Sequence, residues 1–234
     1  MTWIKICGIT NLEDALTAVE AGADALGFVF YQRSPRCIDP ETAREIVTRL
    51  PDKIEKVGVF VEQTAEEVHE IVGRTGLTAV QLYQQQCAEA LHHVQALAFP
   101  TTRSQTKIIF AIPGDPVTAP GGVHVNEGAS LFISKSFKDI LFAVLVDSGS
   151  ATQPGGTGQR FDWIGARAFV PAPGSLIPTI VAGGLQPSNV SVAMSLLHPW
   201  GVDVASGVEA RPGKKDPEKI KAFIAAVRLA EKSV

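Results

Sequence analysis

The chain has 234 residues, a formal net charge of -3 and 19% charged residues, against roughly 25% in an average globular protein. This length suits one domain or two, and the near-neutral charge argues against a protein that binds nucleic acid through a basic face. No apolar run reaches the roughly 18 residues of a membrane span, and the N-terminus enters a strand pattern with no signal peptide. The three cysteines, Cys7, Cys37 and Cys87, lack CxxC spacing, which argues against disulfides and structural zinc. We therefore expect a cytoplasmic globular protein.

Short apolar runs alternate with helical patterns along the chain, which is typical of a parallel sheet covered by helices. The runs are nearly continuous in apolar residues, as expected for strands buried on both faces. In chain order they are Trp3–Cys7, Ala25–Phe30, Lys56–Val61, Ala79–Leu82, Lys107–Ile112, Phe142–Val146, Thr179–Ala182 and Val202–Ala205. These eight units predict an α/β fold, a single (β/α)8 TIM barrel with parallel strands formed by residues 1–234. An open doubly wound sheet is the alternative.

The helices between these runs have recognisable starts and buried faces. Capping-box spacing occurs in two pairs, Thr10 with Glu13 and Thr64 with Glu67. An aspartate followed by proline predicts a helix start at Asp39 and at Asp216. Apolar stripes at helical spacing are Ala43, Ile46, Val47 and Leu50, and Ile220, Phe223, Ile224 and Val227. The stretch from Pro113 to Val125 is rich in proline and glycine, which predicts a loop before a helix between Glu127 and Lys138.

In a barrel of this kind, functional groups gather at the C-terminal ends of the strands. Cys7 ends the first predicted strand and Asp147 follows the sixth, so both open onto one mouth of the barrel. A thiolate can act as a base and a carboxylic acid can donate a proton. The alternatives are an inert buried cysteine and a capping aspartate. Arg36, after the second strand, could bind a carboxylate through two parallel N–H groups, or be a surface arginine in a turn.

Two glycine sites follow the last two strands, Gly183-Gly184 and Ser206-Gly207. Glycines let backbone N–H groups approach an anion, and a helix expected to begin near residues 187–189 adds favourable partial charge. The sites therefore predict phosphate binding, with ordinary turns that need positive φ as the alternative. The spacing is neither that of a Walker loop nor that of a dinucleotide fingerprint. We expect no metal site, because the five histidines lack ligand spacing and His92-His93 fits a solvated helix face.

Together these residues resemble the phosphoribosylanthranilate isomerase family of tryptophan biosynthesis. The similar segments span nearly the whole chain in the family's order. They are Lys5-Ile6-Cys7-Gly8-Ile9-Thr10, residues 22–30, Ser34-Pro35-Arg36, residues 57–61, Gly155-Gly156-Thr157-Gly158 with Phe161-Asp162-Trp163, Ala182-Gly183-Gly184-Leu185, residues 201–209 and Pro212-Gly213-Lys214-Lys215-Asp216.

The resemblance implies a barrel without cofactor or metal that rearranges N-(5'-phosphoribosyl)anthranilate, a small-molecule substrate, to 1-(2-carboxyphenylamino)-1-deoxyribulose 5-phosphate. It implies that Cys7 is the general base, Asp147 the general acid and Arg36 the ligand of the anthranilate carboxylate. The phosphate ligands it implies are Gly183, Gly184, Ser206 and Gly207. Tyr83 stands at a substrate-binding position of the family, which usually reads Gln-Leu-His-Gly where this chain has Gln81-Leu82-Tyr83-Gln84.

Two other functions remain open. A histidine-pathway aminoaldose isomerase resembles this chain in its phosphate sites, but such enzymes have an aspartate where Cys7 stands. A non-catalytic or altered-specificity sugar-phosphate-binding barrel is the second, and the presence of both Cys7 and Asp147 argues against a loss of catalysis. We expect a monomer or homodimer with no nucleic-acid or membrane partner.

Overall fold

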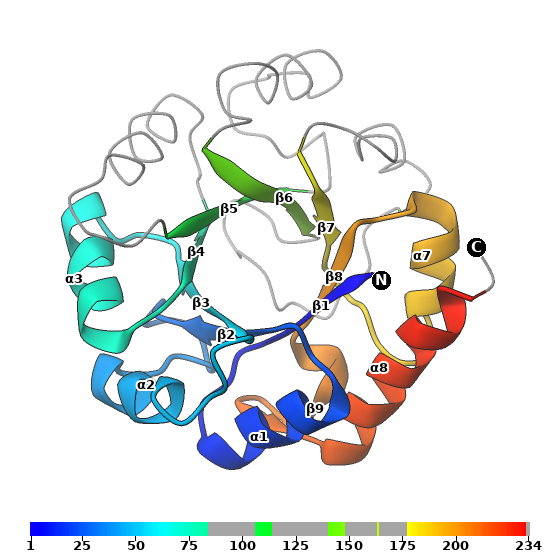
Figure 1. Cartoon of the computed structure of the whole chain (residues 1–234), viewed down its shortest axis with the longest axis horizontal. Coiled ribbons are helices and arrows are strands. Elements are labelled where there is room, and N and C mark those ends of the chain that lie inside the picture. Colours follow the sequence, from blue (N-terminus) through cyan, green and yellow to red (C-terminus); the bar gives the residue numbers. More distant parts are fainter. Residues whose placement is uncertain (84–105, 114–139, 148–162, 164–176, 233–234) are drawn as a thin grey trace.

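The computed structural model describes residues 1–83, 106–113, 140–147, 163 and 177–232. Eight parallel strands close into a barrel in chain order, with β8 returning to pair with β1 (Figure 1). The strands are β1 (Trp3–Cys7), β2 (Ala25–Val29), β3 (Glu55–Phe60), β4 (Ala79–Tyr83), β5 (Lys107–Pro113), β6 (Leu141–Asp147), β7 (Thr179–Val181) and β8 (Gly201–Val204). The predicted (β/α)8 barrel is confirmed, and each strand agrees with its predicted run to within one residue at either end.

Helices lie around the outside of the barrel (Figure 1). Those described are α1 (Leu12–Ala21), α2 (Pro40–Val47), α3 (Ala65–Thr75), α7 (Val190–Leu197) and α8 (Pro217–Ala230). Between β8 and α8 the chain forms a 3-10 turn, η2 (Ser206–Val208), and an antiparallel hairpin of β9 (Glu209–Arg211) and β10 (Lys214–Lys215). This hairpin supplies Glu209, which contacts the cavity-lining Arg36, and Lys215, which contacts Glu209.

Three of the predicted helix starts are confirmed. Asp39 and Asp216 each accept hydrogen bonds from two backbone N–H groups of the first helical turn. Thr64 and Glu67 form a complete capping box. The predicted apolar stripes are buried at all eight positions, namely Ala43, Ile46, Val47, Leu50, Ile220, Phe223, Ile224 and Val227. Local capping chemistry and the 3.6-residue period therefore define these helices.

The predicted capping box of Thr10 and Glu13 is wrong. Helix α1 is capped by Asn11, whose side chain accepts from the Asp14 N–H at 2.9 Å. The Thr10 hydroxyl instead donates to the Gly213 carbonyl at 2.5 Å. Asparagine caps a helix as well as threonine does. The contact that occupies Thr10 comes from a segment far away in the sequence, so local spacing could not show it.

The strands place alternate side chains inside and outside the barrel. Ile4 and Ile6 of β1 belong to the core cluster between the sheet and the helices, which also includes buried residues of α2, α7 and α8. Cys7, two residues beyond Lys5 on the same strand face, lies in a smaller cluster with Val29 and Val59. A separate cluster of mostly small side chains comprises Ala25, Val57, Ala79, Ile109, Ala111, Ala143, Leu145, Ile180 and Ala182.

Several expectations fall outside the described residues. They are most of the loop predicted between residues 113 and 125, the helix predicted between 127 and 138, the glycine-rich segment 155–158, Cys87 and His92-His93.

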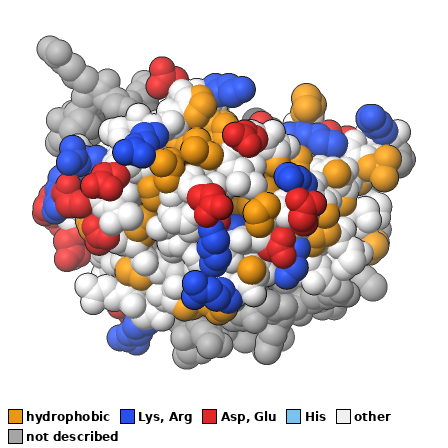
Figure 2. Space-filling model, turned by 90° about the horizontal axis from the view of Figure 1, so that it is seen from below, with side chains coloured by type: hydrophobic (Ala, Val, Ile, Leu, Met, Phe, Trp, Pro, Cys, Tyr) orange, Lys and Arg blue, Asp and Glu red, His pale blue; other side chains and the backbone are white. Residues whose placement is uncertain are grey.

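The face in Figure 2 carries Lys and Arg side chains interspersed with Asp and Glu. Exposed charges of the described residues also form ion pairs; for example, Arg74 lies 2.8 Å from Glu41. Such exposed pairs stabilise a protein by at most about 1 kcal/mol each. No helix among the described residues combines the length and apolarity that a membrane span requires.

Candidate active site

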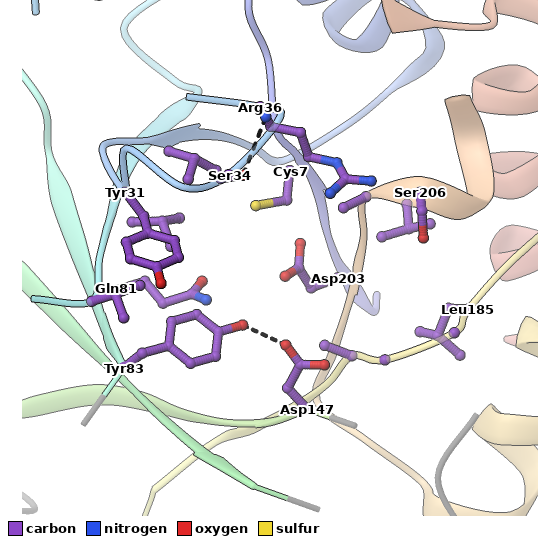
Figure 3. A pocket seen from close by; sticks show the side chains of 18 residues that line it. Cys7, Tyr31, Ser34, Arg36, Gln81, Tyr83, Asp147, Leu185, Asp203 and Ser206 are labelled. Carbon is purple, nitrogen blue, oxygen red and sulfur yellow. Dashed lines mark hydrogen bonds between the residues drawn. The ribbon is translucent and has the colours of Figure 1, made fainter. Parts of the chain in front are cut away.

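A cavity lies where the C-terminal ends of the strands meet, and Figure 3 shows the side chains that line it. About 660 Å³ of space not filled by atoms lies within it, a figure that includes open solvent at its mouth. Cys7 of β1, Tyr83 of β4 and Asp147 of β6 all reach it, because each stands at or near the end of its strand. The structure therefore brings together side chains that are far apart in the sequence.

Cys7 is 7% exposed and lines this cavity. Burial raises the pKa of its thiol above the ordinary value. The ammonium groups of Lys5 and Lys215 oppose that rise, whereas the Asp203 carboxylate adds to it. The thiol is thus held in a site where any further positive charge would favour the thiolate.

Tyr83 and Asp147 contact each other directly. The Tyr83 hydroxyl donates a hydrogen bond to the Asp147 carboxylate (Figure 3). Burial, followed by the negative charge of Asp147, raises the pKa of Tyr83 well above its ordinary value, so the side chain stays a neutral phenol. Sequence reasoning assigned Tyr83 to substrate binding, and the structure adds that it holds the aspartate.

Arg36 is 9% exposed and lines the cavity, so its alternative assignment as a surface arginine is wrong. Its Nε and Nη2 each donate to one oxygen of Glu209 at 2.8 Å. Glu209 also accepts from the buried Lys215 ammonium at 3.0 Å. The carboxylate therefore occupies the Nε–Nη2 edge of the guanidinium, and no acceptor among the described residues binds the Nη1 end.

The loops after β7 and β8 have backbone conformations that glycine favours. Gly183 and Gly184 have φ values of 78° and 66°, and both line the cavity with Ser206. Asn189 ties the first loop together, since its amide donates to the Gly184 carbonyl at 2.9 Å and accepts from the Gln186 N–H at 2.9 Å. Helix α7 begins at Val190, directly after the predicted start.

Gly207 does not line the cavity but packs against the neighbouring loop. A Cβ at this position would lie 1.9 Å from the Leu185 carbonyl oxygen, so only glycine lets the two loops approach. Within the described part of the chain, no acceptor binds the backbone N–H groups of Gly183, Gly184, Ser206 or Gly207. Unpaired N–H groups on two adjoining loops form an arrangement suited to an anion.

Sequence reasoning missed the charged groups beneath and beside these residues. Lys5 is fully buried below Cys7, and its ammonium lies 2.7 Å from Asp203 and 2.8 Å from the Gln81 side-chain oxygen. The second oxygen of Asp203 accepts no hydrogen bond from the described residues, and Asp203 lines the cavity. The sequence does contain a signal for these groups. Lys5 and Asp203 are charged residues within otherwise apolar strands, and a buried charge needs a partner.

A protein-family model of N-(5'-phosphoribosyl)anthranilate (PRA) isomerase matches residues 4–109 and 123–226. The chain belongs to this family. The isomerase from Chlorobaculum parvum is 42% identical over 233 residues, which cover 99% of this chain and 97% of that protein.

Solved structures of the family agree. A phosphoribosyl anthranilate isomerase in complex with reduced 1-(o-carboxyphenylamino)-1-deoxyribulose 5-phosphate aligns with a TM-score of 0.73 and 35% identity, over 97% of this chain and 99% of that one. A structure of monomers generated from the dimeric isomerase of Thermotoga maritima aligns with the same values. The chain is thus a PRA isomerase, an aldose–ketose isomerase of tryptophan biosynthesis. Among the described residues, no three His, Cys, Asp or Glu side chains are grouped as metal ligands.

Proposed function

We propose that Cys7 and Asp147 divide the acid–base work of the isomerase reaction, an Amadori rearrangement of N-(5'-phosphoribosyl)anthranilate. The observation that supports this most strongly is their position. They stand at the ends of β1 and β6 and line one cavity, which the glycine loops also line. A sugar phosphate anchored at those loops would lie between the thiol and the carboxyl group.

In the first step, Asp147 gives its proton to the ring oxygen of the ribose. The C1–O bond breaks, and the nitrogen lone pair forms a C1=N bond, which leaves a cationic Schiff base. The Tyr83 hydroxyl holds the Asp147 carboxyl group in place and stabilises the carboxylate that remains once the proton has left. A residue fixed by a hydrogen bond loses less freedom when it reacts than a mobile one does.

In the second step, the Cys7 thiolate removes the proton from C2. The C–H electron pair forms a C1=C2 bond and neutralises the nitrogen, which gives an enolamine. The cationic Schiff base favours the thiolate and acidifies that proton at the same time. Proton return to C1 and loss of the O2 proton then give the ketone. The product has the same atoms as the substrate, so the sequence of steps balances without a redox partner.

The remaining residues hold the two ends of the substrate. The backbone N–H groups of Gly183, Gly184, Ser206 and Gly207 bind the phosphate, and the Nη1 end of Arg36 binds the anthranilate carboxylate. An arginine already aligned by Glu209 binds a carboxylate with less loss of side-chain freedom. Backbone amides and one arginine suffice for an anionic substrate, which fits a chain with a net charge of -3.

The test is the loss of anthranilate-adduct fluorescence when purified protein is added to freshly made substrate. We expect Cys7→Ala and Asp147→Asn each to abolish turnover while they still bind the reduced product analogue. Cys37→Ser is the matched control, because Cys37 is exposed and does not line the cavity. Full activity of the Cys7→Ala protein would show that another group is the base.

The same assay addresses the alternatives. Turnover of a histidine-pathway aminoaldose in parallel would indicate altered specificity, and binding without any turnover by folded protein would indicate a non-catalytic barrel. We expect activity on the anthranilate substrate alone.

We further propose that residues 1–234 form one domain that acts in the cytoplasm as a monomer or homodimer. A base thiol works only while it is reduced, which supports a reducing compartment. The dimeric Thermotoga maritima isomerase supports the homodimer. Sedimentation of the purified chain measures its oligomeric state, and fractionation of cells of the source organism tests the compartment.

A further inference from the structure

Lys5 is a lysine sealed inside the barrel, directly beneath the proposed base. Its residue exposure is 0%, and it stands two positions before Cys7 on β1, so both side chains lie on the same face of the strand. Burying an ammonium group is strongly unfavourable unless other groups compensate its charge. The structure therefore has to supply partners for this charge.

Two partners aim the ammonium group. Asp203 is the register partner of Lys5 on the adjacent β8, and its Oδ2 lies 2.7 Å from Nζ. Gln81, on β4, accepts from the same nitrogen at 2.8 Å. An ammonium group has three hydrogens, and these two contacts use two of them. The third hydrogen has no acceptor among the described residues unless it faces the sulfur.

Gly27 of β2 places the lysine and the thiol next to each other. A Cβ at this position would lie 2.7 Å from the Cys7 Sγ and 3.1 Å from the Lys5 Cε. The Cys7 Sγ and the Lys5 Cε therefore both pack against the backbone of Gly27, which has no side chain. The two side chains occupy space that any other residue at position 27 would fill.

We propose that Lys5 is a positioning residue whose ammonium group faces the Cys7 sulfur and stabilises its thiolate, with Asp203 and Gln81 fixing its direction. The proposal rests on the assignment of Cys7 as the base. It adds a source of positive charge that is present before the substrate binds.

The other charges around Cys7 leave this role to Lys5. Lys215 of β10 and Arg36 also face the thiol, but both share the Glu209 carboxylate, which reduces their positive field. Asp203 of β8 is the nearby negative charge, and Tyr83 of β4 remains a neutral phenol.

The protonation state of Lys5 fits the role. Burial lowers the pKa of Lys5, but the Asp203 carboxylate and the Cys7 sulfur outweigh it and leave that pKa above its ordinary value. Lys5 therefore carries its charge at neutral pH. It is also the largest influence that opposes the rise in the pKa of Cys7.

The test is a titration of Cys7 in a chain carrying Cys37→Ser and Cys87→Ser, where it is the one remaining cysteine of three. The ultraviolet absorbance of the thiolate is followed against pH. Subtraction of the same chain with Cys7→Ser removes the tyrosinate contribution. We expect Lys5→Met to raise the titration midpoint by about one pKa unit or more, which is the usual effect of removing an opposite charge a few ångströms away. At a pH below the midpoints of both proteins, the thiolate fraction of Cys7 is then about tenfold smaller in Lys5→Met than in the parent chain.

Two further variants make the sign of the effect decisive. Asp203→Asn leaves the ammonium but removes the negative charge, so we expect it to lower the midpoint. Lys56→Met is the matched control, because Lys56 is equally a buried lysine on a barrel strand, but its ammonium contacts the carbonyls of Pro51 and Asp52. An unchanged midpoint in Lys5→Met overturns the proposal. If Lys5→Met does not fold, Lys5→Gln takes its place, because it removes the charge but keeps a hydrogen-bond donor for Asp203 and Gln81; an unchanged midpoint in that variant overturns the proposal.

The pH profile of kcat/KM, which reports the groups of the free enzyme, separates this proposal from the assignment of the base. We expect the acidic limb of that profile to move in Lys5→Met by the same amount as the thiolate titration. If the titration moves and the profile does not, Lys5 still acts on Cys7 but Cys7 is not the base. A purely structural role for Lys5 would lower activity at every pH and leave both midpoints in place.

Discussion

Gly207→Ala tests whether the close approach of the two glycine loops is needed for stability and for phosphate binding. The added Cβ would lie 1.9 Å from the Leu185 oxygen, 2.9 Å from the Leu185 carbonyl carbon and 3.0 Å from the Gln186 Cα. All three are backbone atoms, so no side-chain rotation relieves the clash. The loops have to separate by about 1 Å, because real Cβ atoms essentially never come closer than 3.0 Å to another heavy atom.

The cost of this separation is high for one methyl group. Leu185 is 2% exposed, and the Asn189 side chain ties its loop on both sides, so the loop cannot move freely. Overpacking of this kind destabilises proteins by about 1–3 kcal/mol. For a chain of this size that corresponds to a fall in Tm of roughly 2–12 °C. Losing one hydrogen bond to the phosphate should raise the Kd for the reduced product analogue about tenfold or more.

Thermal unfolding followed by circular dichroism measures the first effect, and titration calorimetry with inorganic phosphate and the product analogue measures the second. Gly73→Ala is the matched control, since Gly73 lies in α3 with no atom within 4 Å of the added Cβ. That variant should be more stable by up to about 1 kcal/mol and bind both ligands normally. A Gly207→Ala protein with the parent's Tm and affinity would refute the reasoning. A lower Tm with normal affinity would confine the contact to a structural role.

Three further predictions concern the walls of the cavity. Tyr83→Phe removes the hydroxyl that holds Asp147. Because one hydrogen bond to a charged group is lost, we expect kcat to fall about tenfold to a hundredfold with a small change in KM. An unchanged kcat in steady-state kinetics would contradict this. A lysine at position 36 cannot keep both contacts to Glu209 and also bind a carboxylate. In Arg36→Lys we therefore expect KM to rise about tenfold for the anthranilate substrate and much less for the aniline analogue, which lacks the carboxylate. An equal rise for both substrates would count against Arg36 as the carboxylate ligand. Burial raises the pKa of Glu209, but its contacts with Arg36 and Lys215 outweigh burial and lower that pKa below the ordinary value. Glu209 therefore stabilises the folded state at pH values above its ordinary pKa, near 4.3. This stabilisation is lost as the pH falls through the lower pKa that Glu209 has in the folded state. Urea unfolding between about pH 5 and pH 3 should show a shallower loss of unfolding free energy for Glu209→Gln, and an identical slope would refute the prediction.

The arrangement of strands and helices followed from the sequence because it depends on local chemistry. Continuous apolar runs mark strands that are buried on both faces, and Asp39, Thr64 and Asp216 cap helices through contacts within one turn. Strand ends in a parallel barrel converge on one mouth, so the positions of Cys7 and Asp147 at their strand ends were enough to place both there. The capping box at Thr10 failed because its hydroxyl is taken by Gly213, a contact that has no local signature.

The sequence by itself determined the barrel, the family resemblance and the residue types at its mouth. Only the tertiary structure decided how those residues pair. Tyr83 reaches Asp147 across 64 residues of sequence, Lys5 reaches Gln81 across 76 and Arg36 reaches Glu209 across 173. Each of these is a buried or part-buried polar contact whose partner is set by barrel closure and strand register, and neither periodicity nor spacing within one strand specifies them. Strand alternation already puts Lys5 and Cys7 on one face of β1, but it is the closure that buries them in a region with little water, where a single charge has a strong effect on a neighbouring thiol.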